Sequence, residues 1–372
     1  MRVGVPKEVK VQEHRVGLTP VAVREYTGAG HQVLVQAGAG GGIGATDAAY
    51  VAAGAHIAAD AAEVFASCDM IVKVKEPQPA ELKLLRRGQI LFTYLHLAPD
   101  PEQAHRLLES GCIAVAYETV TDERGGLPLL APMSEVAGRL AIEAAAFSLR
   151  KPAGGKGLLL GGVPGVQPAR VVVIGGGVVG THAARMAVGL GAEVTVLDRS
   201  LPRLRQLDEM FEGRLRTRYS SAATIEDEVF AADVVIGAVL IPGASAPKVV
   251  TRAMLKQMRP RSVLVDVAID QGGCFETSRP TTHDAPTYEV DDIIHYCVAN
   301  MPGAVPATSS HALNHATLPF GLALAGKGER AMVEDRHLRN GLNVHRGRIT
   351  CEPVAKALGL PAVDAEVALG MV

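Results

Sequence analysis

The chain has 372 residues, 37 Lys and Arg against 39 Asp and Glu, and five cysteines. At this length two domains are expected, each large enough to bury its own core. The balanced charge and the absence of a basic block argue against a nucleic acid or an anionic membrane as the main partner. The cysteines are scattered and none forms a CxxC pair, which indicates the reduced thiols of a cytoplasmic protein and no metal site.

Neither a leader nor a membrane span is expected. The N-terminal segment MRVGVPKEVK is charged and has no apolar core, unlike a signal peptide. The longest uncharged stretch, 304–326, contains Ser, Thr, His and Asn side chains. These polar groups make it unsuited to cross a bilayer.

Short β-branched runs alternate with helical patterns in the first third of the chain. The predicted strands are 2–6, 31–38, 70–77, 90–97 and 112–120. Helical spacing between them is found at 19–30 and 99–111. A long helix is expected over 131–151, with Ser134 as its N-cap. This rhythm predicts parallel strands joined by helical crossovers.

The alternation resumes after a passage rich in Gly and Pro, 151–169, which is expected to hold no regular element. The strands predicted beyond it are 169–176, 192–198, 214–220, 233–240 and 262–270. After about residue 300 the pattern predicts a loop containing proline and then helices over 318–335 and 352–359. The pattern thus predicts a second α/β domain.

The clearest motif lies in residues 169–198. Gly175, Gly177 and Gly180 have GxGxxG spacing, follow an apolar strand and precede a helix, and the next strand ends on Asp198. A dinucleotide site needs these parts: a tight turn, backbone open to the pyrophosphate, a helix N-terminus for its charge, and an acid for the ribose. The motif therefore predicts a Rossmann domain that binds a dinucleotide.

The choice between NAD and NADP is less clear from these residues. Asp198 favours NAD, because its carboxylate would repel a 2′-phosphate. Arg199 and Arg203 follow closely, and either could meet a phosphate, although a solvated charge is the commoner role for an arginine just past a strand.

Ligands of such a sheet lie at the carboxyl ends of its strands. The predicted ends fall at Asp198, Ser220, Val239, Leu240 and Asp270. The Asp270 carboxylate is expected at the rim of the cofactor crevice, although a strand-ending Asp is also a common turn residue. Asp266, within the same predicted strand, is interpreted as a hydrogen-bonded structural acid.

The first third offers a histidine and two lysines with open roles. In a strand over 90–97, Phe92, Tyr94 and His96 share one face. His96 is then either a buried structural histidine or a functional one at the end of the strand. Lys73 and Lys75 alternate on one face of the strand 70–77, and their spacing cannot choose between them.

Three further groups remain without an assigned function from the residues alone. Arg15 lies in a polar loop, where a solvated arginine is the default, and Glu118 is a second acid at a strand end. His14, His311 and His315 are interpreted as surface or loop histidines, because their spacing forms no metal-binding cluster.

Several stretches outside the glycine motif resemble the alanine dehydrogenase family. They are MRVGVPKEVKVQEHRVGLTP, DMIVKVKEP, LFTYLHLAPD, APMSEVAGRLA, VLVDVAIDQGGCFETSRPTTHDAPTY and YCVANMPGAVPATSSHALNHATLPF. The resemblance runs from the first residue to about 320. It implies a cytoplasmic homohexamer that converts L-alanine and NAD reversibly to pyruvate, ammonia and NADH, by hydride transfer from the α carbon and hydrolysis of the imine.

The resemblance also implies residue roles. His96 and Asp270 match the catalytic pair, and Arg15 and Lys75 match the groups that hold the substrate carboxylate. Besides the three motif glycines, the matched NAD contacts are Ser134, Val178, Val179, Asp198, Arg203, Ser220, Val239, Leu240, Val267, Ala268, Ile269, Arg279, Val298, Asn300 and Met301.

These residue types suit the chemistry. An arginine offers a forked pair of hydrogen bonds to a carboxylate, and a lysine a point charge. Histidine titrates near neutral pH, at about 6.5 when unperturbed, as a group that gives and takes a proton must. Asp270 could orient the attacking water and stabilise the developing cation.

Two alternatives remain. One is a carrier subunit like the soluble part of the proton-translocating transhydrogenase, which would need a membrane partner and turn over no amino acid. The other is an opine or saccharopine-type dehydrogenase acting on a larger substrate.

The expected fold is α/β: two doubly wound Rossmann-like domains with a cleft between them. Residues 1–130 and 306–372 form a discontinuous substrate domain, and 131–305 form the NAD domain.

Overall fold

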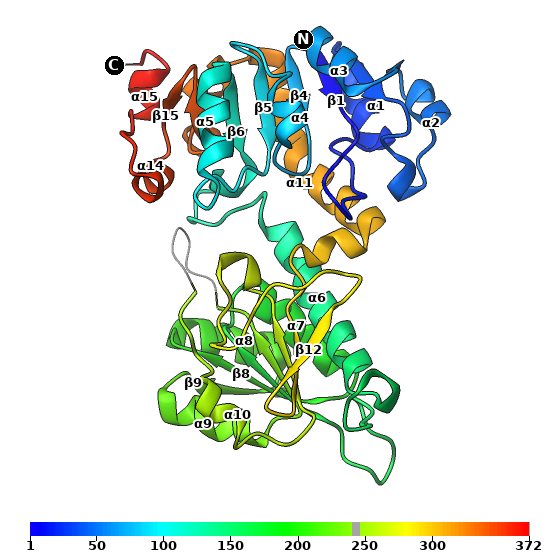
Figure 1. Cartoon of the computed structure of the whole chain (residues 1–372), viewed down its shortest axis with the longest axis vertical. Helices are drawn as coiled ribbons and strands as arrows, with labels where there is room; N and C mark the ends of the chain where they lie inside the picture. The colour runs from blue at the N-terminus through cyan, green and yellow to red at the C-terminus, as the bar shows by residue number, and fades with distance from the viewer. Residues whose placement is uncertain (240–245, 372) are drawn as a thin grey trace. The chain divides into compact units, whose positions relative to one another are not determined.

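The computed structural model describes residues 1–239 and 246–371. The chain divides into two compact units, which Figure 1 colours along the sequence. The first unit is Met1–Met133 with Val305–Val372, and the second unit is Ser134–Ala304. Leu240, a predicted cofactor contact, lies outside the described residues.

The first unit is built on an eight-stranded sheet with the order β15-β14-β6-β5-β4-β1-β2-β3. Its strands are β1 (Arg2–Val5), β2 (Gln32–Gln36), β3 (His56–Ala58), β4 (Met70–Val72), β5 (Ile90–Thr93), β6 (Ile113–Ala116), β14 (Leu342–His345) and β15 (Arg348–Ile349). Strands β1 to β6 pair in parallel, and β14 joins β6 antiparallel. The direction of winding reverses between β1 and β4, which is the topological switch point of a doubly wound fold.

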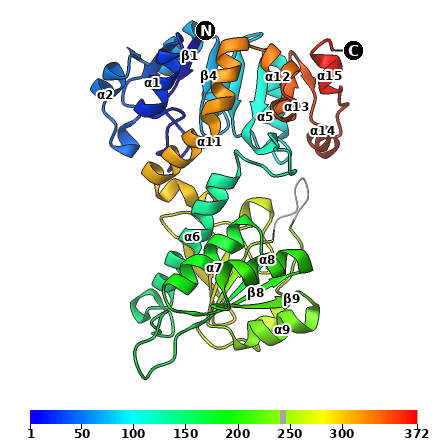
Figure 2. The same ribbon diagram turned by 180° about the vertical axis from the view of Figure 1, so that it is seen from behind.

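Helices cover both faces of this sheet. One face carries α3 (Ala61–Ser67), α4 (Pro79–Leu82) and α5 (Pro101–Ser110), and Figure 2 shows α1 (Pro20–Gly28), α11 (Pro306–Lys327) and α12 (Arg330–Glu334) on the other. Three short helices, α13 (Arg336–Arg339), α14 (Glu352–Leu358) and α15 (Ala365–Ala368), end the chain, and α2 (Asp47–Ala52) precedes β3. Buried Phe65, Leu91 and Leu107 pack between the first group of helices and the sheet.

The second unit has a seven-stranded sheet with the order β12-β13-β11-β10-β7-β8-β9. Its strands are β7 (Arg170–Ile174), β8 (Glu193–Asp198), β9 (Arg216–Tyr219), β10 (Val234–Gly237), β11 (Val263–Asp266), β12 (Thr287–Val290) and β13 (Ile293–Tyr296). All pair in parallel except the edge strand β12. The switch point here lies between β7 and β10, so both units have the doubly wound order.

Two apolar clusters bury the faces of this second sheet. Helices α6 (Ala131–Ser148), α7 (Val178–Gly189) and α8 (Leu201–Phe211) lie on one face, as Figure 2 shows. Their buried residues form the first cluster with the sheet. On the other, α9 (Ala222–Ala231) and α10 (Arg252–Leu255) contribute Val229 and Leu255 to the second cluster. The α/β class and the doubly wound topology predicted from the sequence are therefore confirmed.

Several predicted boundaries are wrong. The predicted strand 90–97 ends at Thr93. The Tyr94 N–H still donates to the Val74 carbonyl at 3.3 Å, but the Leu95 and His96 N–H groups donate to the Glu118 carboxylate instead, and His96 has a left-handed φ of 49°. The predicted strand 262–270 ends at Asp266, whose carboxylate accepts the Ala268 N–H and closes a turn. Ser134 is not an N-cap, because α6 begins at Ala131.

The C-terminal part was also predicted incompletely. Helix α11 begins at Pro306, not at 318, because the proline that suggested a loop occupies the first helical position. Several of the polar residues in this stretch are buried within the first unit. Asn314, for example, accepts from the Thr19 N–H at 2.6 Å and donates to the Gly17 carbonyl at 2.9 Å. No helix in the described part of the chain, α11 included, has the length and apolarity to cross a membrane.

Candidate active site

The glycine motif forms a tight turn between β7 and α7. Gly175 has φ +103°, and a Cβ there would lie 2.5 Å from the Ala238 carbonyl oxygen. A Cβ on Gly180 would lie 1.8 Å from the Gly175 carbonyl oxygen, so only glycine lets the helix pack this closely. Gly177 is the N-cap of α7 without a side-chain cap, and a Cβ on it would meet nothing within 4 Å. The open space before the first helical N–H groups fits a pyrophosphate.

Asp198 ends β8 beside this turn. Its carboxylate accepts from the Gly176 N–H at 2.7 Å and from the Ser200 N–H at 2.8 Å. In a dinucleotide fold an acid at this position binds the adenosine ribose. The glycine turn and the acid together fit the cofactor that the motif predicts.

Arg203 lies one turn into α8 and is directed at the same turn. Its guanidinium donates to the Gly176 carbonyl and to the Thr181 hydroxyl, both at 2.6 Å, and to Gln206 at 2.9 Å. The guanidinium is therefore bound to the glycine turn. The solvated charge that is the commoner role for an arginine just past a strand is not found here.

The other predicted cofactor contacts follow the ends of neighbouring strands. Ser220 follows β9, and its N–H donates to the Asp198 carbonyl at 2.9 Å. Val239 follows β10 close to Gly175. Val178 and Val179 begin α7. Two buried residues, Val298 and Met301, follow β13. Asn300, between them, has a left-handed φ of 61°. Ser134 is half-buried on α6.

Arg279 sits on an aromatic stack. Its guanidinium carbon lies 4.0 Å from the centre of the Tyr288 ring, and that ring also stacks with His295, with centroids 5.0 Å apart. The Arg279 N–H also donates to the Tyr288 hydroxyl at 2.8 Å. Tyr288 therefore fixes both the backbone and the side chain of Arg279.

Asp270 lies beyond β11, within the short 3-10 turn Ile269–Gln271. Val267, Ala268 and Ile269 lead to it from the strand, and Ala268 and Ile269 are buried while Asp270 is exposed. The prediction that Asp270 ends the strand is wrong, but it still projects from the carboxyl side of the sheet. The interpretation of Asp266 as a hydrogen-bonded structural acid is confirmed, since it is fully buried and accepts from Cys274 N–H at 2.9 Å.

In the first unit, Arg15 lies in the loop after β1 and is only 2 % exposed. The Glu13 carboxylate accepts from its Nε at 2.7 Å and from a terminal nitrogen at 2.6 Å, and the other terminal nitrogen lies 3.0 Å from the Met133 sulfur. Burial opposes the charge of Arg15, but the Glu13 carboxylate raises the pKa of the guanidinium. The solvated arginine expected in a polar loop is therefore not what the structure contains.

Lys73 and Lys75, which spacing could not tell apart, both follow β4. Lys73 is fully buried, and its ammonium lies 3.1 Å from Glu8 and 2.7 Å from Glu81. Burial opposes its charge, but the two carboxylates raise its pKa. Lys73 is therefore part of a structural ion-pair network. The second lysine, Lys75, is 8 % exposed.

The loops after β1 and β4 are tied to one another. Glu8 accepts from the Val74 N–H at 2.7 Å, and a Cβ on Gly17 would lie 2.3 Å from the Val72 carbonyl oxygen. These contacts bring the loop of Arg15 against the segment of Lys75. The two residues therefore flank the switch point of the first sheet, as the glycine turn and Val239 do in the second.

His96 follows β5 and its side chain is exposed. Its ring stacks on Tyr94, with centroids 5.8 Å apart and planes 10° apart. Glu118, just past β6, accepts the backbone N–H of His96 at 2.7 Å and of Leu95 at 3.1 Å. Glu118 was left unassigned by the sequence because the residues it contacts follow another strand. Glu13 was not singled out by the sequence, and its ion pair with Arg15 is evident only from the burial of both side chains.

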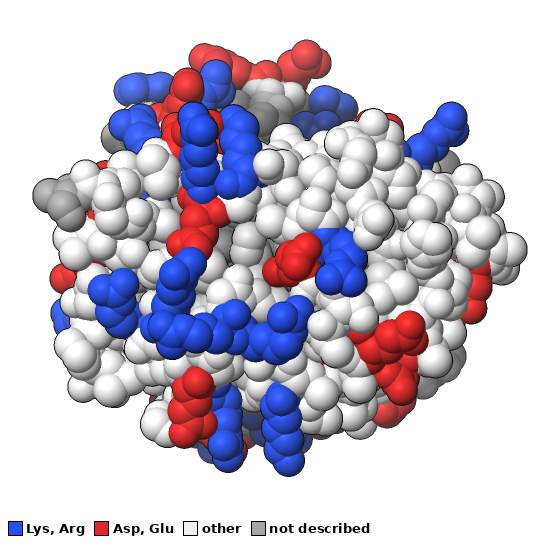
Figure 3. Space-filling model, turned by 90° about the horizontal axis from the view of Figure 1, so that it is seen from above, with Lys and Arg blue, Asp and Glu red and all other residues white. Residues whose placement is uncertain are grey.

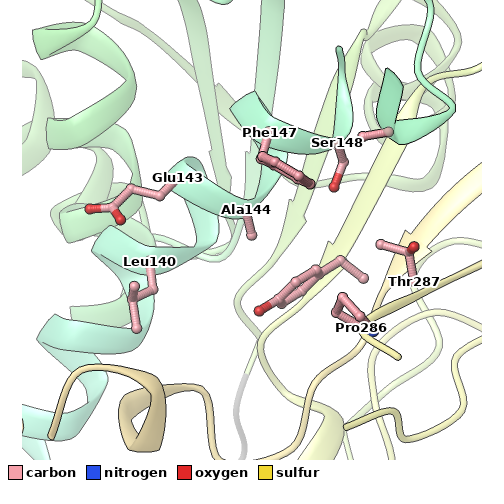
Figure 4. Close-up of a pocket in the computed structure, with 9 residues that line it drawn as sticks. Leu140, Glu143, Ala144, Phe147, Ser148, Pro286 and Thr287 are labelled. Carbon is pink, nitrogen blue, oxygen red and sulfur yellow. The ribbon is translucent and has the colours of Figure 1, made fainter. Parts of the chain in front are cut away.

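The second unit also contains a pocket away from the predicted site residues. A pocket of about 310 Å³ lies between α6 and β13, lined by Leu140, Phe147, Pro286 and Tyr296, and contains none of the predicted site residues (Figure 4). The described residues contain no group of three or more His, Cys, Asp or Glu placed to bind a metal.

The surface charge is mixed on the face drawn in Figure 3. There, a band of Lys and Arg is flanked by Asp and Glu and by broad uncharged areas.

Comparison with known proteins relates both units to one family. The N-terminal domain of alanine dehydrogenase/PNT matches residues 4–137, and the C-terminal domain matches residues 141–352. An alanine dehydrogenase of Halomonas elongata is 59 % identical over 371 residues, which cover 100 % of both chains.

Solved structures agree with this relationship. An L-alanine dehydrogenase matches with a TM-score of 0.94 and 51 % identity, over 96 % of this chain and 99 % of that one. A transhydrogenase from Sinorhizobium meliloti matches with a TM-score of 0.81 and 26 % identity, over 95 % and 99 %. The chain belongs to the alanine dehydrogenase/PNT family, and the resemblance seen in its sequence is confirmed.

Proposed function

We propose that this enzyme, an amino-acid dehydrogenase of its family, catalyses the reversible NAD-dependent oxidative deamination of L-alanine to pyruvate and ammonia. The observation that carries the proposal is the placement of the site residues around two switch points. Arg15 and Lys75 flank that of the first sheet, and the glycine turn lies at that of the second. The first set suits a small carboxylate substrate, and the second suits a dinucleotide.

The proposal gives each of these residues one part in the reaction. A nicotinamide dinucleotide, held by the glycine turn and Asp198, would supply the acceptor for the hydride of the alanine α carbon, and the imine left on the substrate would be hydrolysed by water. Arg15 and Lys75 hold the substrate carboxylate, so that the α carbon has one orientation. His96 takes a proton from the attacking water and returns one to the departing amine. The Asp270 carboxylate stabilises the positive charge that develops on the imine.

Two observations favour alanine dehydrogenation over a carrier subunit or a dehydrogenase of larger substrates. The identity to L-alanine dehydrogenase is 51 %, about twice the 26 % to the transhydrogenase. The chain also has the histidine, arginine, lysine and aspartate that amino-acid turnover requires.

The decisive experiment follows NADH oxidation with pyruvate alone, with ammonium alone, and with both. Loss of NADH absorbance only when both are present would support reductive amination. Replacing pyruvate with 2-oxoglutarate tests the larger substrate. Tight NADH binding with no turnover in any mixture would contradict the proposal and favour the carrier subunit.

The preference for NAD over NADP is expected to depend on Asp198. An Asp198→Ala variant should lose at least about tenfold in kcat/KM for NADH, because it loses hydrogen bonds from the ribose to a charged group. Its relative activity with NADPH should rise, because the repulsion of a 2′-phosphate is removed. Steady-state rates with both cofactors measure this ratio. Asp208→Ala, at an exposed position of the next helix, is the control, and an unchanged ratio at Asp198 would refute the assignment.

The two lysines are expected to separate binding from stability. Lys75→Met should raise the KM for pyruvate by about tenfold or more, because a charge-assisted hydrogen bond to the carboxylate is lost. Lys73→Met should instead lower the free energy of unfolding by about 3–5 kcal/mol, because Glu8 and Glu81 remain buried without their cation. Pyruvate kinetics and urea unfolding of both variants test the distinction, and the reverse pattern would exchange the two roles.

We also propose that the enzyme is a cytoplasmic homohexamer. The resemblance to the family supports the assembly, and the five cysteines, all without disulfides, suit a reducing compartment. Light scattering on the purified protein gives the mass of the assembly, and a monomeric mass would contradict it.

A further inference from the structure

We propose that Asp266 is a positioning residue, which holds the loop that carries Asp270 in its active geometry. The inference rests on the proposed function, because that function gives Asp270 its part in the reaction. Asp266 itself is fully buried at the end of β11 and touches no reacting group in this proposal.

The two oxygens of this one carboxylate join the beginning of the loop to its end. Oδ1 accepts from the Ala268 N–H at 3.1 Å, and Oδ2 accepts from the N–H groups of Cys274 at 2.9 Å and Phe275 at 3.2 Å. Asp270 lies between these anchor points. Strand β11 ends at Asp266, and the last bond to β10 beyond it is made by the Val267 N–H. The position of Asp270 therefore depends on bonds within the loop, and the Asp266 carboxylate makes those that join the two ends of the loop.

The loop backbone is shaped to close over the carboxylate. Gly272 and Gly273 have φ values of +85° and +72°, a conformation that side chains disfavour. A Cβ on Gly273 would lie 2.6 Å from the Asp266 Oδ2. The close approach of the backbone to the acid thus requires glycine at this point.

The same carboxylate reaches a second segment. The Ser278 hydroxyl donates to Oδ2, and Ser278 directly precedes Arg279, which the family resemblance places at the cofactor. One buried acid is therefore shared by the loop of Asp270 and by the segment of Arg279. A change at Asp266 would disturb both together.

Asp266 makes no salt bridge among the described residues, and the Cys274 thiol, 3.5 Å from Oδ1, completes a set of neutral donors. Burial raises the pKa of its carboxyl group, while Ser278, Phe275 and Cys274 counteract that rise. An Asp266→Asn change would remove the buried charge but turn an amide NH₂ toward groups that are themselves donors. The expected effect is a displaced loop in a protein that still folds.

A second buried acid in the same unit provides a control for the loss of a buried carboxylate. Asp233 is 3 % exposed, precedes β10 at the opposite end of the sheet, and also accepts a backbone N–H, that of Arg170 at 2.9 Å. Unlike Asp266 it forms an ion pair with Lys156 at 2.8 Å, so its replacement is expected to lower stability at least as much. Both changes replace a buried carboxylate with an amide. Only Asp266 contacts the loop of Asp270.

The experiment compares Asp266→Asn with Asp233→Asn by amide hydrogen exchange, by NADH affinity and by kcat. For Asp266→Asn we expect faster exchange within 267–279 and a kcat lower by about ten- to a hundredfold, the scale of a slightly misplaced catalytic group. Asp233→Asn should leave exchange in that segment unchanged and kcat within about twofold, whatever its melting temperature. Unchanged exchange in Asp266→Asn together with normal kcat would overturn the inference.

A double mutant tests whether Asp266 acts through Asp270. In an Asp270→Asn background, Asp266→Asn should lower kcat by less than about twofold, since the group it positions is already gone. Additive losses would overturn the inference. If Asp266→Asn does not fold, Ser278→Ala replaces it, with an expected rise of about fivefold in the NADH dissociation constant and an unchanged melting temperature.

The outcome is separable from failure of the proposed function. If the wild-type protein binds NADH but turns over no amino acid, the proposed function fails. Hydrogen exchange in 267–279 and NADH affinity then still decide whether Asp266 holds the loop.

Discussion

Replacing His96 with alanine is expected to lower turnover in both directions by at least about a hundredfold, the usual scale for a positioned acid–base group. NADH affinity should remain within about twofold, because the cofactor residues lie in the second unit. The exposed imidazole is stacked on Tyr94 and its backbone is held by Glu118, so its orientation is defined although its nitrogens are accessible. Steady-state rates and NADH fluorescence titration measure the two effects.

The left-handed φ of 49° at His96 calls for a second variant, because alanine disfavours that conformation. Asn tolerates it, so His96→Asn removes the acid–base group with less backbone strain and should be equally slow. Added imidazole should partly restore the rate of His96→Ala, since the position is exposed. His105→Ala, on the exposed face of α5, should keep full activity. A His96→Asn enzyme with most of its rate would refute the assignment.

The cofactor half could be predicted from the sequence because its determinants are local. The spacing of Gly175, Gly177 and Gly180 reflects contacts between residues close in the chain, such as the Gly180 Cβ position against the Gly175 carbonyl. The acid of the motif, Asp198, lies at the end of the adjacent strand, as the pattern predicts. The predicted turn, helix and acid are therefore all found in the structure.

The roles of the proposed substrate-binding residues are harder to predict from the sequence, because they depend on contacts between residues that are distant in the chain. The structural role of Lys73 is recognised from its ion pairs with Glu8, 65 positions away, and with Glu81. The burial of Arg15 likewise depends on the loop packing against β4 and on Met133. No periodicity in the sequence contains these contacts, so spacing alone could not rank the residues.

The errors in strand ends have a common physical origin. Apolar character continues through Leu95 and through Ile269, but the strands end earlier, at Thr93 and at Asp266. In each case a carboxylate accepts backbone N–H groups from the segment that leaves the sheet: Glu118 from Leu95, and Asp266 from Ala268. The loops that carry His96 and Asp270 are thus shaped by side-chain acceptors, which a β-strand pattern does not contain.

The second large effect is expected at Asp270. Asp270→Asn should lower kcat by about a hundredfold or more, because it removes a negative charge that stabilises the developing cation. The isosteric amide keeps the size of the side chain, and the loop should stay in place because Asp266 and its donors are untouched. NADH affinity should change by less than about threefold. The loss should therefore appear in kcat, with the KM for pyruvate nearly constant, which is the signature of an interaction made chiefly in the transition state.

Three comparisons make this result interpretable. Asp208→Asn, the same substitution at an exposed position of α8, should leave kcat unchanged. Asp270→Glu keeps the charge but moves it by one methylene, and should be slower than wild type yet faster than Asp270→Asn. If Asp270→Asn instead raises the KM for pyruvate at constant kcat, the residue acts in substrate binding. Normal kcat and KM would remove Asp270 from the reaction, and the positioning role of Asp266, which depends on Asp270, would fail with it.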